Sequence, residues 1–228
     1  MQRTYYFIRH AVPINDAGLF SISSFEKDML EGTDLPLSDI GKKQARDVAE
    51  TIRHLSIQHL VSSTLKRAVE TAEIIAERTG IPYREKFEEL VEFSMGAVSH
   101  RQFDFFKLFI KADFPKQTKR FVSAAMYQFM SIYYLFQWYR GKTRGGDAMK
   151  TIYQKTSLIL KKLDDFPETH IAVVGHGYWI FFLALNVLGG SRRNISRLSF
   201  VKNCSITRID SDGLGRYRLI FFAKKHRC

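Results

Sequence analysis

Two short apolar runs in this chain each end directly on a histidine. Residues 4–9 lead into His10, and residues 169–175 lead into His176. Both runs are rich in aromatic or β-branched residues, which is typical of buried strands. In a parallel sheet the carboxyl ends of such strands lie at one edge, where the catalytic groups of α/β proteins gather. The spacing therefore predicts that the two histidines share one site.

The remaining sequence alternates strand and helix patterns in the same way. We expect strands at residues 60–63, 205–209 and 216–222, and helices at residues 38–52, 65–78 and 178–188, with residues 101–163 mostly helical. Residues 87–93 are ambiguous between strand and loop. This alternation predicts an α/β three-layer sandwich, with a mainly parallel central sheet and helices on both faces. We expect a single domain over residues 1–228, with an inserted helical cap at about residues 97–142.

Composition narrows the class of protein further. The two cysteines, Cys204 and Cys228, form neither a disulfide framework nor a metal-ligand spacing, so we expect a reducing, cytoplasmic compartment. The apolar stretch at the N-terminus is too short for a signal peptide. The formal charge is +12, with an excess of Lys and Arg in the C-terminal third. That region is either a solvated basic surface or a surface that attracts anions, and no nucleic-acid-binding motif accompanies it, so a nucleic-acid partner is not expected.

The residue types at the strand ends favour phosphoryl chemistry. A guanidinium group pairs with phosphate oxygens through two parallel hydrogen bonds, which makes Arg9 and Arg67 candidates. Arg67 is expected about one turn inside the helix that follows residues 60–63, whose amino end also attracts anions. His10 beside Arg9 suits a nucleophile, because neighbouring cations disfavour its protonated form. One of three clustered carboxyl groups is the candidate proton donor: Glu88, Glu89 or Glu92.

Other kinds of site are not indicated. The chain has no Walker loop, no dinucleotide fingerprint after its first strand, no Gly-x-Ser-x-Gly elbow and no zinc-ligand cluster.

Five motifs, in order along the chain, resemble those of the histidine phosphatase superfamily, also called phosphoglycerate mutase-like. They are Arg9-His10-Ala11, Leu35-Pro36-Leu37-Ser38 with Gly41 and Gln44-Ala45, Ser62-Ser63-Thr64-Leu65 with Arg67-Ala68 and Thr71-Ala72, Leu90 with Glu92 and Gly96, and Gly175-His176-Gly177. The similarity covers the chain from about residue 4 to residue 222.

The resemblance implies a role for each matching residue. His10 would be the nucleophile that becomes phosphohistidine. Arg9, Arg67 and His176 would hold the phosphoryl group, and Glu92, rather than Glu88 or Glu89, would be the general acid. Asn15 would approach the phosphate, although its spacing is imperfect. No metal and no organic cofactor is implied, and the substrate would be a phosphorylated small molecule.

Departures from the family pattern bear on the reaction. The segment Glu92-Phe93-Ser94-Met95-Gly96 lacks the Arg-His-Tyr that mutases carry after the glutamate, which favours a phosphatase. Ala11-Val12-Pro13 and Thr64 also differ from the common residues, and they leave the substrate open. A phosphomonoester hydrolase is therefore the first hypothesis. A phosphoglycerate mutase-type phosphotransferase and a non-catalytic phosphate-binding module are the alternatives.

An uncharged aromatic stretch, residues 121–139, is the most unusual segment of the chain. Its length suits a membrane span, but a span here would put His10 and His176 on opposite sides of a bilayer. We therefore expect a buried or interfacial cap helix that roofs the site or forms a homodimer contact. Peripheral membrane attachment is the alternative. An aromatic roof also hints at an apolar or ring-bearing substrate.

Overall fold

The structure is a computed structural model that describes residues 2–14, 34–94, 140–190 and 201–224, together with single positions between them. The chain divides into two compact units. Unit 1 comprises Met1–Ile14, Asp34–Glu92 and Ile152–Cys228, and unit 2 comprises Asn15–Thr33 and Phe93–Thr151.

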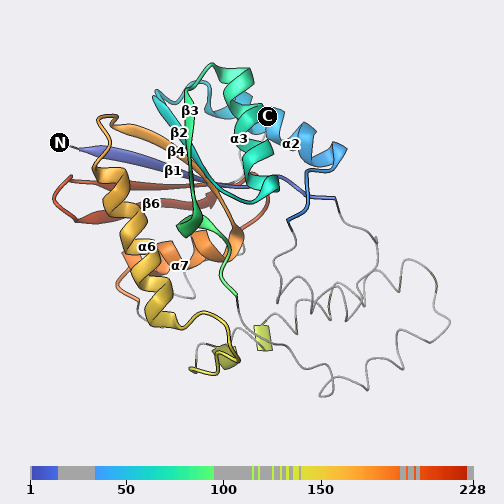
Figure 1. Cartoon of the computed structure of the whole chain (residues 1–228), viewed down its shortest axis with the longest axis vertical. Helices are drawn as coiled ribbons and strands as arrows, with labels where there is room; N and C mark the ends of the chain where they lie inside the picture. Colours follow the sequence, from blue (N-terminus) through green and yellow to red (C-terminus); the bar gives the residue numbers. More distant parts are fainter. Residues whose placement is uncertain are drawn as a thin grey trace. The chain divides into compact units, whose positions relative to one another are not determined.

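Unit 1 is built on a sheet that has six strands among the described residues (Figure 1). The strands are β1 (Arg3–Arg9), β2 (His59–Ser63), β3 (Tyr83–Phe87), β4 (His170–Gly175), β5 (Ile206–Ser211) and β6 (Tyr217–Lys224). Their order is β3-β2-β4-β1-β5-β6, with β3, β2, β4 and β1 parallel and β5 and β6 antiparallel. The predicted mainly parallel α/β sheet is therefore confirmed.

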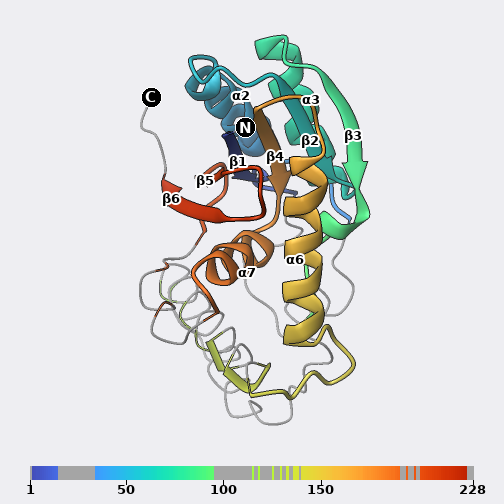
Figure 2. The same ribbon diagram turned by 90° about the vertical axis from the view of Figure 1, so that its left-hand side faces the viewer.

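Helices cover both faces of this sheet (Figure 2). They are α2 (Asp39–Ile52), α3 (Lys66–Thr79), α6 (Met149–Asp164) and α7 (Gly177–Val187), with a short 3-10 helix, η1 (Glu88–Leu90). Successive side chains of a strand point to opposite faces. Tyr6 and Ile8 of β1 pack in the cluster formed by α2 and α3. Phe7 points the other way and stacks on Trp179 of α7, with ring centroids 5.9 Å apart.

The helix boundaries follow the predicted signals closely. Ser38 is the N-cap of α2, and its hydroxyl accepts a hydrogen bond from the amide of Gly41 at 3.1 Å. Gly80 ends α3 in the left-handed conformation, with φ of 74°. Arg67 is the second residue of α3, nearer its start than the predicted full turn. Strand β3 was not predicted, because its sequence is mostly charged and its side chains are partly or fully exposed.

Unit 2 contains the whole aromatic stretch of residues 121–139, of which only some residues are described. Trp138 is fully buried, and its indole N–H donates to the carbonyl of Asp147 at 2.5 Å. Phe129, Ile132 and Phe136 are exposed by more than half. No helix among the described residues is long and apolar enough to cross a membrane. The role of residues 97–142 as a cap stays a prediction.

Candidate active site

The carboxyl ends of β1, β2 and β4 bring the predicted site residues together. Arg9 is in register with Gly175, and Ser62 with Val174, so the residues that follow these strands are neighbours. The rings of His10 and His176 lie with centroids 5.1 Å apart. Both side chains are buried in unit 1. The convergence expected from the strand pattern is present.

The hydrogen bonds of His10 define which of its nitrogens is free to react. Nδ1 lies 2.7 Å from the carbonyl oxygen of Ala11, which only accepts, so Nδ1 carries the proton. The Nε–H of Arg67 donates to Nε2 at 3.2 Å, which requires a lone pair there. Burial, with the cations Arg9 and Arg67 nearby, lowers the pKa of His10 well below its usual 6.5. His10 is thus a neutral imidazole with an unprotonated Nε2.

Contacts of its main chain fix the position of His10 between β4 and the segment that precedes β5. Its amide donates to Gly175 at 2.9 Å, and its carbonyl accepts from the side chain of Asn203 at 2.8 Å. Thr71 of α3 contacts the segment after β1: its hydroxyl accepts from the amide of Ala11 at 3.1 Å and donates to the carbonyl of Arg67 at 2.6 Å. One hydroxyl group therefore bonds both to the residue that follows His10 and to the backbone of Arg67.

Arg9 lies against the start of α7. Its Nη1 donates to the carbonyl of Val201 at 2.6 Å. A Cβ on Gly177 would lie 3.2 Å from the Nε of Arg9, closer than nine in ten real Cβ contacts. Glycine at this position lets the guanidinium group pack directly on the helix backbone.

His176 is fully buried and is the N-cap residue of α7. Its Nε2 lies 2.9 Å from the hydroxyl oxygen of Ser63. Burial lowers the pKa of His176 well below 6.5, and the neighbouring His10, Arg67 and Arg9 add to that effect. His176 is therefore also neutral near pH 7.

Glu92 faces the amino end of α7. Its carboxylate accepts hydrogen bonds from the amides of Tyr178 at 3.2 Å and Trp179 at 2.8 Å. Burial raises the pKa of Glu92, while attraction to Arg9 and Arg67 and the two amide bonds oppose that rise without cancelling it. The result is a carboxyl group that holds its proton at higher pH than an exposed glutamate does.

The other carboxyl candidates differ from Glu92, and Glu88 is exposed. Glu89 accepts from the ammonium group of Lys162 at 2.6 Å, and this contact lowers its pKa. A carboxyl group held ionised by a lysine is a poor proton donor. Asn15 lies outside the described residues. Ser63, Thr71 and Asn203 were given no site role from the sequence, because only contacts in the folded chain connect Ser63 to His176, Thr71 to Ala11 and Asn203 to His10.

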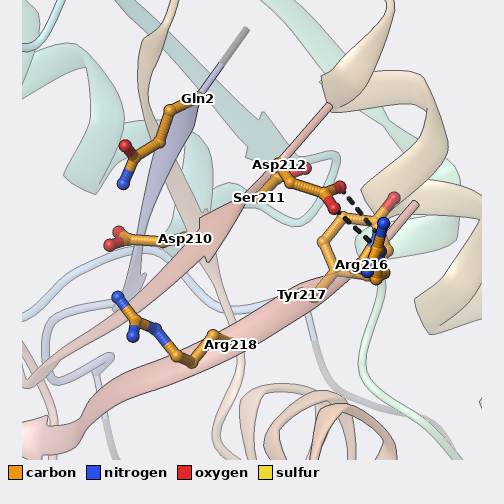
Figure 3. A pocket seen from close by; sticks show the side chains of 7 residues that line it. All are labelled: Gln2, Asp210, Ser211, Asp212, Arg216, Tyr217 and Arg218. Atoms are coloured by element: carbon orange, nitrogen blue, oxygen red, sulfur yellow. Dashed lines mark hydrogen bonds and ion pairs between the residues drawn. The ribbon is translucent and has the colours of Figure 1, made fainter. Parts of the chain in front are cut away.

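No group of three or more His, Cys, Asp or Glu side chains suited to a metal ion occurs within the described ranges. A separate cleft of about 330 Å³ lies beside the start of β1 and the β5–β6 hairpin (Figure 3). It is lined by Gln2, Asp210, Ser211, Asp212, Arg216, Tyr217 and Arg218. Since β1 is seven residues long, this cleft is about 20 Å from His10 at the rise of an extended strand. No histidine lines it.

Comparison with known proteins identifies the family to which the chain belongs. The family model of the histidine phosphatase superfamily (branch 1) matches residues 5–219. The chain belongs to this superfamily. Among curated proteins, it is 30% identical to the "Probable phosphoglycerate mutase GpmB" of Salmonella choleraesuis (strain SC-B67) over 181 residues, 78% of this chain and 74% of that relative. The GpmB protein of Salmonella typhi is also 30% identical, over 179 residues.

Solved structures of similar fold include a named phosphatase and a protein named YhfR. A mycobacterial glucosyl-3-phosphoglycerate phosphatase matches with a TM-score of 0.68 and 22% identity over 99% of this chain and 100% of that one. YhfR of Bacillus stearothermophilus matches with a TM-score of 0.69 and 19% identity over 98% of both chains. At this identity the likeness concerns the fold, and the sheet and helices of unit 1 are those of a histidine phosphatase.

Proposed function

We propose that this protein is a phosphomonoester hydrolase that works through a phosphohistidine at His10. The observation that carries the proposal is the orientation of the imidazole. Its Nδ1 is bound to a carbonyl, and its Nε2 keeps a lone pair beside the Arg67 guanidinium group. A nucleophile for phosphorus needs such a lone pair, and the transferring group needs cations around it. Both conditions are met in one buried place.

In the first proposed step, Nε2 of His10 attacks the phosphorus atom. The N–P bond forms as the bond from phosphorus to the ester oxygen breaks. Arg9 and Arg67 stabilise the negative charge on the phosphoryl oxygens, and His176 donates a hydrogen bond to one of these oxygens. The leaving oxygen takes a proton from the Glu92 carboxyl group, whose pKa is raised by burial.

In the second step, water attacks the phosphohistidine. The Glu92 carboxylate, left ionised by the first step, removes a proton from that water. The N–P bond breaks, inorganic phosphate leaves and His10 recovers its lone pair. Every proton is returned, and no metal or organic cofactor takes part in these steps.

The substrate we propose is a small phosphomonoester, with an aromatic or otherwise apolar alcohol portion. The aromatic residues of unit 2 motivate this choice. One of the structural neighbours is named a glucosyl-3-phosphoglycerate phosphatase, which supports a small-molecule substrate for this fold. We also propose a cytoplasmic location, where the buried thiol of Cys204 would stay reduced.

A phosphotransferase is the second candidate, because the curated relatives at 30% identity are named phosphoglycerate mutases. The same phosphohistidine serves both reactions, and only the acceptor differs. A mutase passes the phosphoryl group to a second hydroxyl group, whereas a hydrolase passes it to water. Incubation with 3-phosphoglycerate separates them: the hydrolase releases inorganic phosphate, and the mutase forms 2-phosphoglycerate.

The proposal is tested by replacing the nucleophile. His10→Ala should abolish turnover of an aryl phosphate such as 4-nitrophenyl phosphate. His170→Ala, at the opposite end of β4, is the matched control and should retain turnover. Retained turnover in the His10 variant would contradict the mechanism. An inactive wild type that still binds phosphate would instead favour a non-catalytic binding module.

A further inference from the structure

Ser63 is the described side chain that hydrogen-bonds to the imidazole of His176. It is the last residue of β2, adjacent to the end of β4, and both Ser63 and His176 are fully buried. The distance from Ser63 Oγ to His176 Nε2 is 2.9 Å. A neutral imidazole carries its proton on one nitrogen only, so the direction of this bond decides what the other nitrogen offers.

The need of the Ser63 hydroxyl hydrogen for an acceptor indicates that the serine is the donor. The amide of Leu65 points its hydrogen at Ser63 Oγ over a long 3.4 Å, so the hydroxyl oxygen already serves as an acceptor. Among the contacts of Ser63 in the described part of the chain, His176 Nε2, at 2.9 Å, is the atom able to accept the hydroxyl hydrogen if it carries no proton. A buried hydroxyl without an acceptor is costly. Donation from Ser63 to Nε2 satisfies it and leaves the proton of His176 on Nδ1.

The other nitrogen of His176 is then a donor in the right surroundings. Its Nδ1 is buried and has no hydrogen-bond partner among the described residues. The ring belongs to the same cluster as His10, 5.1 Å away between centroids. An N–H that is buried, unpaired and beside a nucleophile suits an anionic oxygen as its partner.

We propose that Ser63 is a positioning residue that holds His176 as the Nδ1–H tautomer, so that a neutral imidazole donates to the phosphoryl group. The inference rests on the proposed function for the identity of the ligand. The tautomer itself depends only on the contacts of Ser63. Without the hydroxyl, Nε2 loses its donor and both tautomers become accessible, which weakens phosphate binding.

The test is nitrogen-15 NMR of the protein with labelled histidines. The chain has seven histidines, and the His176 signals are identified by their loss in His176→Gln. At pH 7 the wild type should show protonated Nδ1 and unprotonated Nε2. Ser63→Ala should shift His176 toward the Nε2–H form, and Ser63→Thr, which keeps a hydroxyl, should restore the wild-type pattern. A wild type protonated on Nε2 would overturn the inference.

Ser62→Ala is the matched control. Ser62 is equally buried in the same strand, but its hydroxyl bonds to the Ser63 carbonyl and to Tyr83 rather than to a histidine. The inhibition constant for inorganic phosphate should rise about 10- to 100-fold in Ser63→Ala, as for other residues that orient a binding histidine, and less than about twofold in Ser62→Ala. Equal phosphate affinity in Ser63→Ala and wild type would contradict the inference.

The two proposals fail separately. A wild type that binds phosphate through an Nδ1–H His176, yet turns over no ester, would remove the proposed hydrolase and support the role of Ser63. An active wild-type enzyme in which His176 is protonated on Nε2 would support the proposed hydrolase and remove the role of Ser63.

Discussion

Gly41→Ala should destabilise the protein even though alanine is the better helix former. A Cβ at this third position of α2 would lie 2.0 Å from the carbonyl oxygen of Val12, so the two backbones must move apart by about 1.4 Å to reach ordinary contact. That oxygen accepts from both the amide and the hydroxyl of Ser38, at 3.1 and 3.0 Å. The movement would break both bonds.

The magnitude follows from these contacts. Two lost hydrogen bonds cost about 2 kcal/mol, and overpacking adds about 2 kcal/mol. The higher helix propensity of alanine returns about 1 kcal/mol. We expect a net loss of about 3 kcal/mol in the free energy of unfolding. For a chain of this size the melting temperature should fall by about 6–12 °C.

Urea denaturation, with thermal unfolding beside it, measures this loss. Ile40→Ala at the adjacent, 69% exposed position is the control and should change stability by less than about 0.5 kcal/mol. Because Val12 is two residues from His10, the shift should also lower kcat/KM about 100-fold, the usual effect of a misplacement near 1 Å. A Gly41→Ala variant as stable as the wild type would refute the reasoning about this close approach.

Three further predictions concern the site. Glu92→Gln should lower kcat/KM, which reports formation of the phosphohistidine, about 100-fold or more for alkyl phosphates and far less for 4-nitrophenyl phosphate, because only the poor leaving group needs a proton; equal losses of kcat/KM on both would contradict its role as acid. The low pKa of His10 should keep kcat/KM from falling as the pH drops through 6.5. Over the same pH range the histidines of the unfolded chain bind protons, whereas the buried His10 and His176 stay neutral, so the free energy of unfolding should fall in urea titrations. A free energy of unfolding that rises as the pH drops would contradict the burial of neutral rings. Gly177→Ala should displace Arg9 by a few tenths of an ångström and reduce kcat/KM several-fold with an unchanged melting temperature; loss of stability in place of activity would argue against this contact.

Local sequence signals account for much of the fold. The apolar runs before His10 and His176 predicted the two strands that carry them, and Ser38 and Gly80 marked helix ends through their own chemistry. Strand β3 escaped prediction, because an edge strand with charged side chains lacks the apolar pattern of a buried one.

The site could be predicted only in outline from the sequence. The strand ends indicated which residues converge, but spacing did not choose among the three glutamates. The choice of Glu92 came from the family resemblance, and its carboxylate on the α7 amides is a tertiary contact. The same holds for Ser63 and Thr71, whose partners are distant in the sequence or belong to another element. No local pattern reports on such contacts.

The most direct test of the central claim is to trap the covalent intermediate. Wild-type protein mixed with a phosphorus-32-labelled phosphomonoester and stopped in alkali should carry label that survives base and is lost in acid, the behaviour of a phosphohistidine. Peptide mapping should place that label on His10. Label on a different residue, or turnover without any labelled protein, would contradict the account.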